Sequence, residues 1–235
     1  PIMSDDDDDV EDIMSICGGL NINIGTLNKN TIPSMFLAGK KANELGHIVL
    51  LDPVGAGASR LRTDTANRLM QEVRFDAVRG NISEIKTLCT GSGSTKGVDA
   101  DAVDAVTEAN LDDGVQLVKT FAQRAGCIVA VTGAIDLVSD GERCWCIRNG
   151  RAEMSRITGT GCQLSALMTA FLVANPDHKL DAAAAAVCMM GLAGEIGWAN
   201  MQPGDGNSTY RNRIIDAIFN MTGDALEKGA KYELR

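Results

Sequence analysis

The sequence predicts an α/β fold in which a doubly wound, mainly parallel sheet carries helices on both faces, in three layers. Apolar runs typical of strands alternate with segments of helical spacing, and short loops join them. The run His47–Leu51 is continuously apolar, as strands buried on both faces are. Aromatic residues make up only 4% of the chain, and small side chains let helices pack closely on a sheet. The 235 residues predict one domain, residues 1–235.

The first half of the chain alternates predicted strands with predicted helices. Ile32–Leu45 has helical spacing, with Pro33 in the first turn, where proline is tolerated, and Gly46 closing the helix. The strand His47–Leu51 leads into the glycine-rich loop Asp52–Gly57. The other elements expected here are strands at Leu20–Ile24 and Phe75–Val78 and helices at Thr63–Glu72 and Ile82–Leu88.

The second half begins with Thr90–Ala109, which is rich in Gly, Ser, Asp and Ala and predicts a surface excursion containing a short helix. An amphipathic helix is expected at Leu111–Ala125, followed by a fourth apolar strand at Cys127–Val131. Two further strands form a hairpin around Asp140 and Gly141. The hairpin strands are Ile135–Val138 and Cys144–Arg148, and the last three helices are Gly159–Ala174, Leu180–Asn200 and Tyr210–Met221.

Composition excludes several classes of partner. The net charge is −9, so neither nucleic acid nor an anionic membrane is an expected partner. The acidic run Asp5–Asp9 is expected to be a solvated face rather than a metal site. Seven cysteines occur without zinc spacing or a CxxC pair, mostly in apolar runs, which predicts reduced thiols and a cytoplasmic location. We expect no signal peptide and no membrane span.

Polar or glycine-rich residues follow each of the four predicted parallel strands. They are Asn23–Thr26, Asp52-Pro53, Arg79–Asn81 and Thr132-Gly133. Ligands of such sheets bind beyond the carboxyl ends of the strands. The sequence therefore predicts an active site where these four loops meet.

The sharpest feature of this site is the stretch from Gly159 to Cys162, Gly-Thr-Gly-Cys, at the start of an apolar helix. Two glycines let backbone amides approach a ligand, and a helix N-terminus carries unpaired N–H groups and partial positive charge. Gly159 and Gly161 therefore suit a phosphate or a phosphoryl group in transfer. The alternative is a tight helix entry without a ligand. No Gly-Lys-Ser/Thr follows, so this is not a Walker A loop.

A metal and a nucleotide have candidate ligands on the neighbouring loops. Asn81 and Glu84 share one helix face and could hold Mg²⁺, or else form a helix cap. Asp52 ends a buried strand and could support the same ion, or simply form a turn. Arg79 could contact a nucleotide phosphate through its planar fork, and the Thr132 hydroxyl could bind phosphate. An anion hole, a metal and positioned donors are what phosphoryl transfer needs.

Taken together, these stretches resemble hydroxyethylthiazole kinase, a family of the ribokinase-like superfamily, along nearly the whole chain. The matching stretches are Pro1–Met3, Asn23–Leu27, Leu51–Gly57, Arg79–Ile85, Val131–Gly133, Asp136–Gly141 and Ile157–Cys162. The resemblance implies a transferase that moves the ATP γ-phosphoryl group to the hydroxyl of 4-methyl-5-(2-hydroxyethyl)thiazole, with Mg²⁺, in thiamine biosynthesis or salvage.

The family pattern also implies roles for single residues. Met3 and Gly159 would lie at the thiazole, Arg79 and Thr132 would bind ATP, and Glu84 would belong to the magnesium motif with Asp52 nearby. The resemblance also implies a homotrimer in which a neighbouring subunit completes each site. The family usually has a further segment upstream of Pro1, which helps form the thiazole pocket, so we expect an N-terminal segment to be missing here.

Cys162 separates this family from its relatives. By the family pattern, most ribokinase-like kinases carry Asp at the position of Cys162, as the base that takes the hydroxyl proton. Thiazole kinases carry Cys at this position. A thiol at a helix N-terminus could act as a weak base, or Cys162 could only shape the site. The rival functions are a kinase of another small alcohol such as hydroxymethylpyrimidine, an NAD(P)H-hydrate dehydratase, and an inactive nucleotide-binding fragment.

Overall fold

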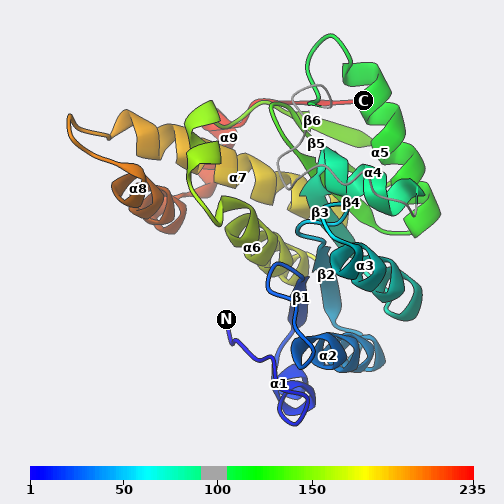
Figure 1. Cartoon of the computed structure of the whole chain (residues 1–235). Helices are drawn as coiled ribbons and strands as arrows, with labels where there is room; N and C mark the ends of the chain where they lie inside the picture. Colours follow the sequence, from blue (N-terminus) through cyan, green and yellow to red (C-terminus); the bar gives the residue numbers. More distant parts are fainter. Residues whose placement is uncertain (91–104) are drawn as a thin grey trace.

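A seven-stranded sheet organises the computed structural model, which describes residues 1–90 and 105–235 (Figure 1). The sheet order is the chain order, from β1 to β7. Strands β1 to β4 pair in parallel and the last three pairings are antiparallel, so all strands except β5 and β7 point the same way. This confirms the mainly parallel sheet. The strands are β1 (Gly19–Asn23), β2 (Ile48–Asp52), β3 (Ala77–Asn81), β4 (Ile128–Thr132), β5 (Asp136–Ser139), β6 (Cys144–Ile147) and β7 (Tyr232–Leu234).

Helices cover both faces of the sheet, as the doubly wound prediction requires. Alternate residues of β2 divide the core, because successive side chains of a strand point to opposite faces. Val49 and Leu51 belong to the core layer of the first five helices, whereas Leu50 belongs to the layer of the later helices. The first layer holds α1 (Val10–Ile16), α2 (Thr31–Leu45), α3 (Arg60–Glu72), α4 (Ile82–Thr90) and α5 (Leu111–Ala125).

The second face carries the C-terminal half of the chain. Figure 1 shows α6, α7 and α8 on the side of the sheet opposite α2 to α5, with α8 projecting furthest from the strands. These elements are the 3₁₀ helix η1 (Ala152–Arg156), α6 (Thr160–Ala174), α7 (Lys179–Ala199), α8 (Asn207–Asn220) and α9 (Gly223–Gly229).

The expected boundaries differ most at β3. The strand was expected at Phe75–Val78, with Arg79 to Asn81 in the following loop, but it runs from Ala77 through Asn81. The reason is pairing: Arg79, Gly80 and Asn81 are in register with Ala130 to Thr132 of β4. α1, η1, α9 and β7 were not predicted. Most of the predicted excursion Thr90–Ala109 lies outside the described residues.

The expectation that no apolar segment has the length of a membrane span is wrong for α7. Its 21 residues are long and apolar enough by composition, and 67% of the qualifying window is buried. α7 packs on α6, α8, α9 and strands β4 to β6. Its apolar surface is therefore explained by its place as a core helix.

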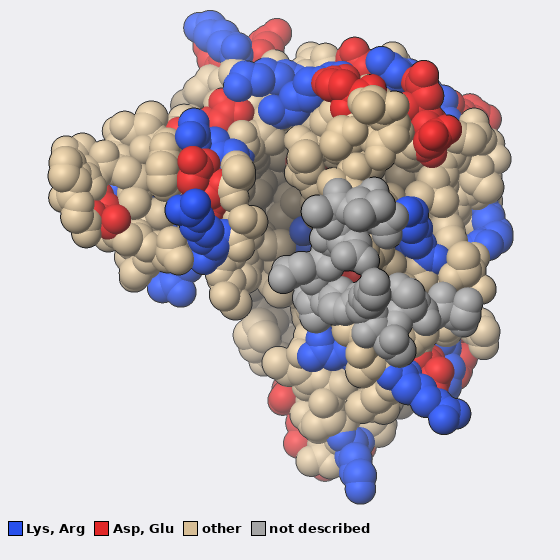
Figure 2. Space-filling model, turned by 45° about the horizontal axis from the view of Figure 1, so that its top comes forward, with Lys and Arg blue, Asp and Glu red and all other residues tan. Residues whose placement is uncertain are grey.

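Surface charge follows the sequence expectation. Asp5 to Asp9 are exposed, and Val10 begins α1 directly after them. Carboxylates at a helix N-terminus are favourable because of the helix dipole. Figure 2 shows basic and acidic side chains interspersed over the face in view, beside a hollow that separates the part carrying α8 from the rest. The described cysteines are all free.

Candidate active site

The ends of four parallel strands place the predicted site residues along one edge of the sheet. Asn23 of β1 is in register with Asp52 of β2, and Asn81 of β3 is in register with Thr132 of β4. Because these strands point the same way, their last residues lie at the same edge. The predicted meeting of these loops is confirmed.

Asp52 is a fully buried carboxylate in the middle of this edge. Its Oδ2 accepts hydrogen bonds from Asn23 Nδ2 at 2.9 Å and from Ser165 Oγ at 2.8 Å. Its Oδ1 lies 3.7 Å from Arg79 Nη1 and has no hydrogen-bond partner among the described residues. Burial raises the pKa of Asp52, and Arg79, Ser165 and Asn23 offset part of that shift. Oδ1 is thus a buried acceptor still open to a cation or a donor.

Glu84 is the second buried carboxylate of the site. Asn81 Oδ1 accepts from the Glu84 amide and Glu84 Oε2 accepts from the Asn81 amide, both at 2.8 Å. This reciprocal pair is a capping box, so Asn81 and Glu84 form the helix cap that the sequence offered as an alternative. Glu84 Oε1 accepts from the Gly55 amide at 2.8 Å, which ties the glycine-rich loop after β2 to α4. Burial raises the pKa of Glu84, and the two backbone hydrogen bonds oppose the shift.

Arg79 connects the two sides of the site. Its Nη2 donates to Thr132 Oγ1 at 2.6 Å, and only 12% of the side chain is exposed. A Cβ at Gly161 would lie 2.6 Å from Arg79 Nη1, so the guanidinium rests directly against the first turn of α6. Arg79 Nε is buried and has no partner among residues 1–90 and 105–235. The guanidinium therefore keeps donor capacity at the helix N-terminus.

The N-terminus of α6 completes the arrangement. Gly159 precedes the helix with φ 96°, a left-handed conformation that favours glycine. Cys162, in the first turn, is exposed, and its Sγ accepts from Asn23 Nδ2 at 3.2 Å. The Asn23 amide orientation is fixed because its Oδ1 accepts from the Gly25 amide at 2.9 Å. The loop before Cys162, the end of β2 at Asp52 and the start of α4 at Glu84 thus share one edge.

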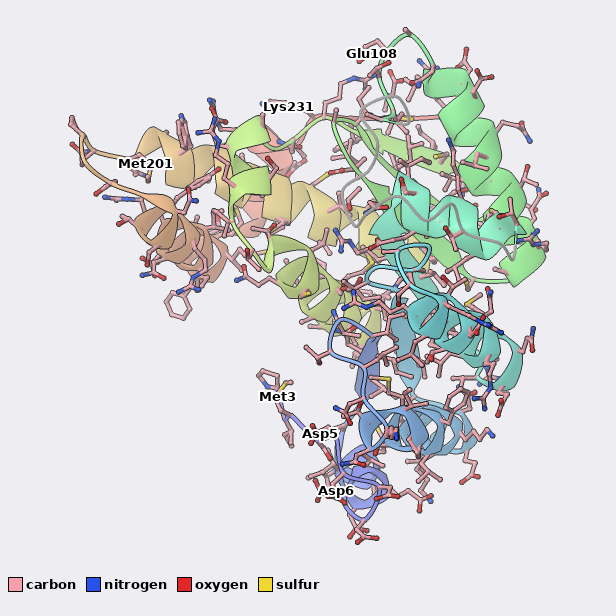
Figure 3. The ribbon with its side chains drawn as sticks, in the orientation of Figure 1. Met3, Asp5, Asp6, Glu108, Met201 and Lys231 are labelled. Carbon is pink, nitrogen blue, oxygen red and sulfur yellow. The ribbon has the colours of Figure 1, made fainter. Side chains whose placement is uncertain are left out.

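Met3 lies apart from these hydrogen bonds, in the extended N-terminal segment. This residue is 95% exposed. Figure 3 shows Met3 outside the ribbon, on the side where the chain begins. Met3 and Asn23 nevertheless line the same cavity, of about 300 Å³, together with residues of β1 and α2. Asn23, which lines this cavity, also contacts Cys162 in the first turn of α6.

Two contributors were not singled out from the sequence. Ser165 lies three residues after Cys162, a spacing that places both on one helix face and could have indicated it. Arg62 of α3 donates to the carbonyls of Gly25 and Val54 and so joins the loops after β1 and β2. No local pattern indicates Arg62, because its partners lie in other elements.

Comparison with known proteins gives the family of this chain. The model of the hydroxyethylthiazole kinase family matches residues 1–224. Hydroxyethylthiazole kinase of Clostridium acetobutylicum is 54% identical over 233 residues, covering 99% of this chain and 85% of the relative. The enzyme of Clostridium beijerinckii is 46% identical, covering 99% of this chain and 83% of the relative.

Two solved structures of kinases are similar to this chain. The hydroxyethylthiazole kinase protein of Pyrococcus horikoshii superposes with a TM-score of 0.86 at 29% identity, covering all of this chain and 84% of that one. Pyridoxal kinase of Staphylococcus aureus with ADP has a TM-score of 0.60 at 15% identity, covering 96% of this chain and 76% of that one, and shows the shared ribokinase-like fold. From the family match along the chain and these relatives, this protein belongs to the hydroxyethylthiazole kinase family.

Proposed function

We propose that the edge formed by β1 to β4 and α6 is where this kinase transfers the γ-phosphoryl group of ATP to 4-methyl-5-(2-hydroxyethyl)thiazole. In this reaction the alcohol oxygen forms a bond to the γ-phosphorus, the bond to the ADP oxygen breaks, and the hydroxyl proton is released to water. The observation that carries the proposal is the packing of Arg79 against Gly161, which brings a cation to the helix N-terminus beside Cys162.

In this proposal Arg79 and Thr132 bind the nucleotide. The guanidinium, held by Thr132 at 2.6 Å, presents its remaining donors beside Gly161. Charge-assisted hydrogen bonds from arginine suit phosphate oxygens. The amides that follow Gly159 and Gly161 add donors and helix-dipole charge on the same side, where negative charge develops during transfer.

Asp52 and Glu84 would hold Mg²⁺. The residues fit the ion, because Asp52 Oδ1 is a buried oxygen without a hydrogen-bond partner. Glu84 uses one lone pair of each oxygen on a backbone amide, so contact through water suits it better. No cluster of three or more metal-binding side chains occurs among the described residues. The ion would therefore take most of its oxygen ligands from phosphate and water, and it would neutralise phosphate charge. Asn81 would support Glu84 as its cap.

The thiazole alcohol would occupy the cavity between Met3 and Asn23, with its hydroxyl toward Gly159 and Cys162. Asn23 holds Cys162 Sγ at 3.2 Å and also bonds Asp52, so the thiol is oriented whether it acts as a base or as a spacer. The family pattern further leads us to infer a cytoplasmic homotrimer in which a neighbouring subunit completes this cavity.

An assay of ADP release with a panel of alcohols tests the proposal. Release with the thiazole alcohol, and little with hydroxymethylpyrimidine, is expected. Nucleotide binding without turnover of any alcohol would contradict it and favour an inactive nucleotide-binding chain.

The role of the thiol is separable. Cys162→Ala should lower kcat by about a hundredfold if the thiol is a general base. Unchanged kcat would leave Cys162 as a spacer, and Cys127→Ala, which removes a buried thiol just before β4, is the matched control.

A further inference from the structure

Asp136 stands beside the nucleotide edge without a role in the scheme above. It is the first residue of β5, half-buried, and follows β4 after a three-residue loop. Its Oδ1 accepts a hydrogen bond from the Gly133 amide at 2.8 Å. Gly133 directly follows Thr132, whose hydroxyl holds Arg79 Nη2 at 2.6 Å. The carboxylate thus closes the turn that presents Thr132 to Arg79.

Asp136 lies on the face of the sheet that α7 covers, near groups from β3 and α7. Leu137 packs in the core layer of α5, and Val138 packs in the layer of α6 and α7. Asp136, two residues before Val138, therefore faces α7 and not α5. The titratable groups that act on it are Arg79 from β3 and the buried Cys188 thiol from α7.

A negative charge on Asp136 is costly. Burial raises the pKa of Asp136 to about 7, although the Gly133 amide and the Arg79 charge oppose the shift. The Asp136 charge also adds to the burial that raises the pKa of Cys188 to about 12. A polyphosphate placed at Arg79 would add negative charge on the same side, and like charge favours the neutral carboxyl.

We propose that Asp136 is a positioning residue of the nucleotide site, which fixes the Thr132-Gly133 turn and through it the Arg79 guanidinium. The inference rests on the proposed binding of ATP by Arg79 and Thr132. Loss of Asp136 should act mainly on ATP, because its contacts run through Gly133 and Thr132 to Arg79, the proposed ATP ligand. ATP affinity should also decrease as the pH rises through about 7, where Asp136 gains its charge.

Two substitutions test this. Asp136→Ala removes the acceptor of the Gly133 amide and should raise KM for ATP about tenfold, with KM for the thiazole alcohol unchanged. Asp136→Asn keeps an acceptor oxygen and removes the charge, so it should retain a KM for ATP near that of the wild type. The rise of this KM between about pH 6 and about pH 8 should disappear in Asp136→Asn. Titration of ATP itself affects both proteins equally.

Asp140→Ala is the matched control. Asp140 follows the other end of β5, and its Oδ1 accepts hydrogen bonds from the amides of Glu142 and Arg143. It is therefore also a turn-closing carboxylate, but it lies away from Arg79. Its loss should leave both KM values unchanged. Arg79→Ala, measured in parallel, should raise KM for ATP.

The outcomes separate the two proposals. An unchanged KM for ATP in folded Asp136→Ala, with a raised KM in Arg79→Ala, overturns the role of Asp136 alone. Unchanged ATP binding in Arg79→Ala overturns the nucleotide role of Arg79 and this inference with it. If Asp136→Ala does not fold, the pH profile of Asp136→Asn decides, and a profile identical to the wild type overturns the proposal.

Discussion

Gly161→Ala perturbs the proposed nucleotide site through a single added carbon. The new Cβ would lie 2.6 Å from Arg79 Nη1 and 2.9 Å from Nη2, whereas ordinary contacts begin at 3.4 Å. The guanidinium must therefore retreat by about 0.8 Å from the helix. A retreat of this size should lengthen its 2.6 Å bond to Thr132 or its 3.7 Å approach to Asp52.

Gly161→Ala should weaken ATP binding without lowering the stability of the fold. A hydrogen bond to a charged group contributes about 1.5–3 kcal/mol, so ATP affinity should fall about ten- to a hundredfold. Gly161 has no left-handed φ and lies inside α6, where alanine is favoured over glycine by up to about 1 kcal/mol. The clash is with the end of a flexible side chain. The fold should therefore keep or slightly gain stability while nucleotide binding weakens.

The assay combines steady-state KM for ATP, KM for the thiazole alcohol and urea unfolding. Gly223→Ala is the control, because its Cβ would meet nothing within 4 Å and its φ is not in the left-handed region. A folded Gly161→Ala protein whose KM for ATP stays within about twofold of the wild type would refute the reasoning, since that is far below the expected effect.

Two further predictions concern the buried carboxylate Asp52. Ser165→Ala removes the 2.8 Å hydrogen bond to Asp52 Oδ2 and should lower the free energy of unfolding by about 1–3 kcal/mol; urea midpoints that match the wild type would contradict this. Burial raises the pKa of Asp52, so the native state holds the proton more tightly than the unfolded chain does. The stability that Asp52 contributes is therefore fully present below its unfolded pKa, about 4, and is lost as the pH rises through its folded pKa. The decline should be shallower in Asp52→Asn, as unfolding titrations would show, and equal slopes would count against it.

The elements that the sequence predicts well are those defined by local signals. α5 has its expected bounds, Leu111–Ala125, because an amphipathic repeat ends at Gly126, whose φ is 65°. β7 was missed because its three residues owe their conformation to pairing with β6, more than 80 residues away. β3 was placed too early because the polar stretch Arg79 to Asn81 does not look like a strand until β4 pairs with it.

The candidate site divides in the same way. The residue types at strand ends and the glycines before Cys162 were visible in the sequence, because each depends on its immediate neighbours. The capping box of Asn81 and Glu84 was also visible as an alternative, since it spans three residues. The bond from Asn23 to Cys162 joins residues 139 positions apart, and that from Ser165 to Asp52 joins residues 113 apart. Such pairs follow from the packing of α6 on β1 and β2, which no local pattern contains.

The two buried carboxylates of the site are costly to the fold. Asp52 and Glu84 are buried, and burial raises the pKa of both. A chain selected for stability alone would have little use for them, because apolar residues of similar size avoid the desolvation cost. Hydrogen bonds from β1, β3, α6 and the loop after β2 fix the orientation of their oxygens. The fold therefore holds these acceptors in place. Asp52 Oδ1, the acceptor left without a donor, is where that orientation would act on a ligand.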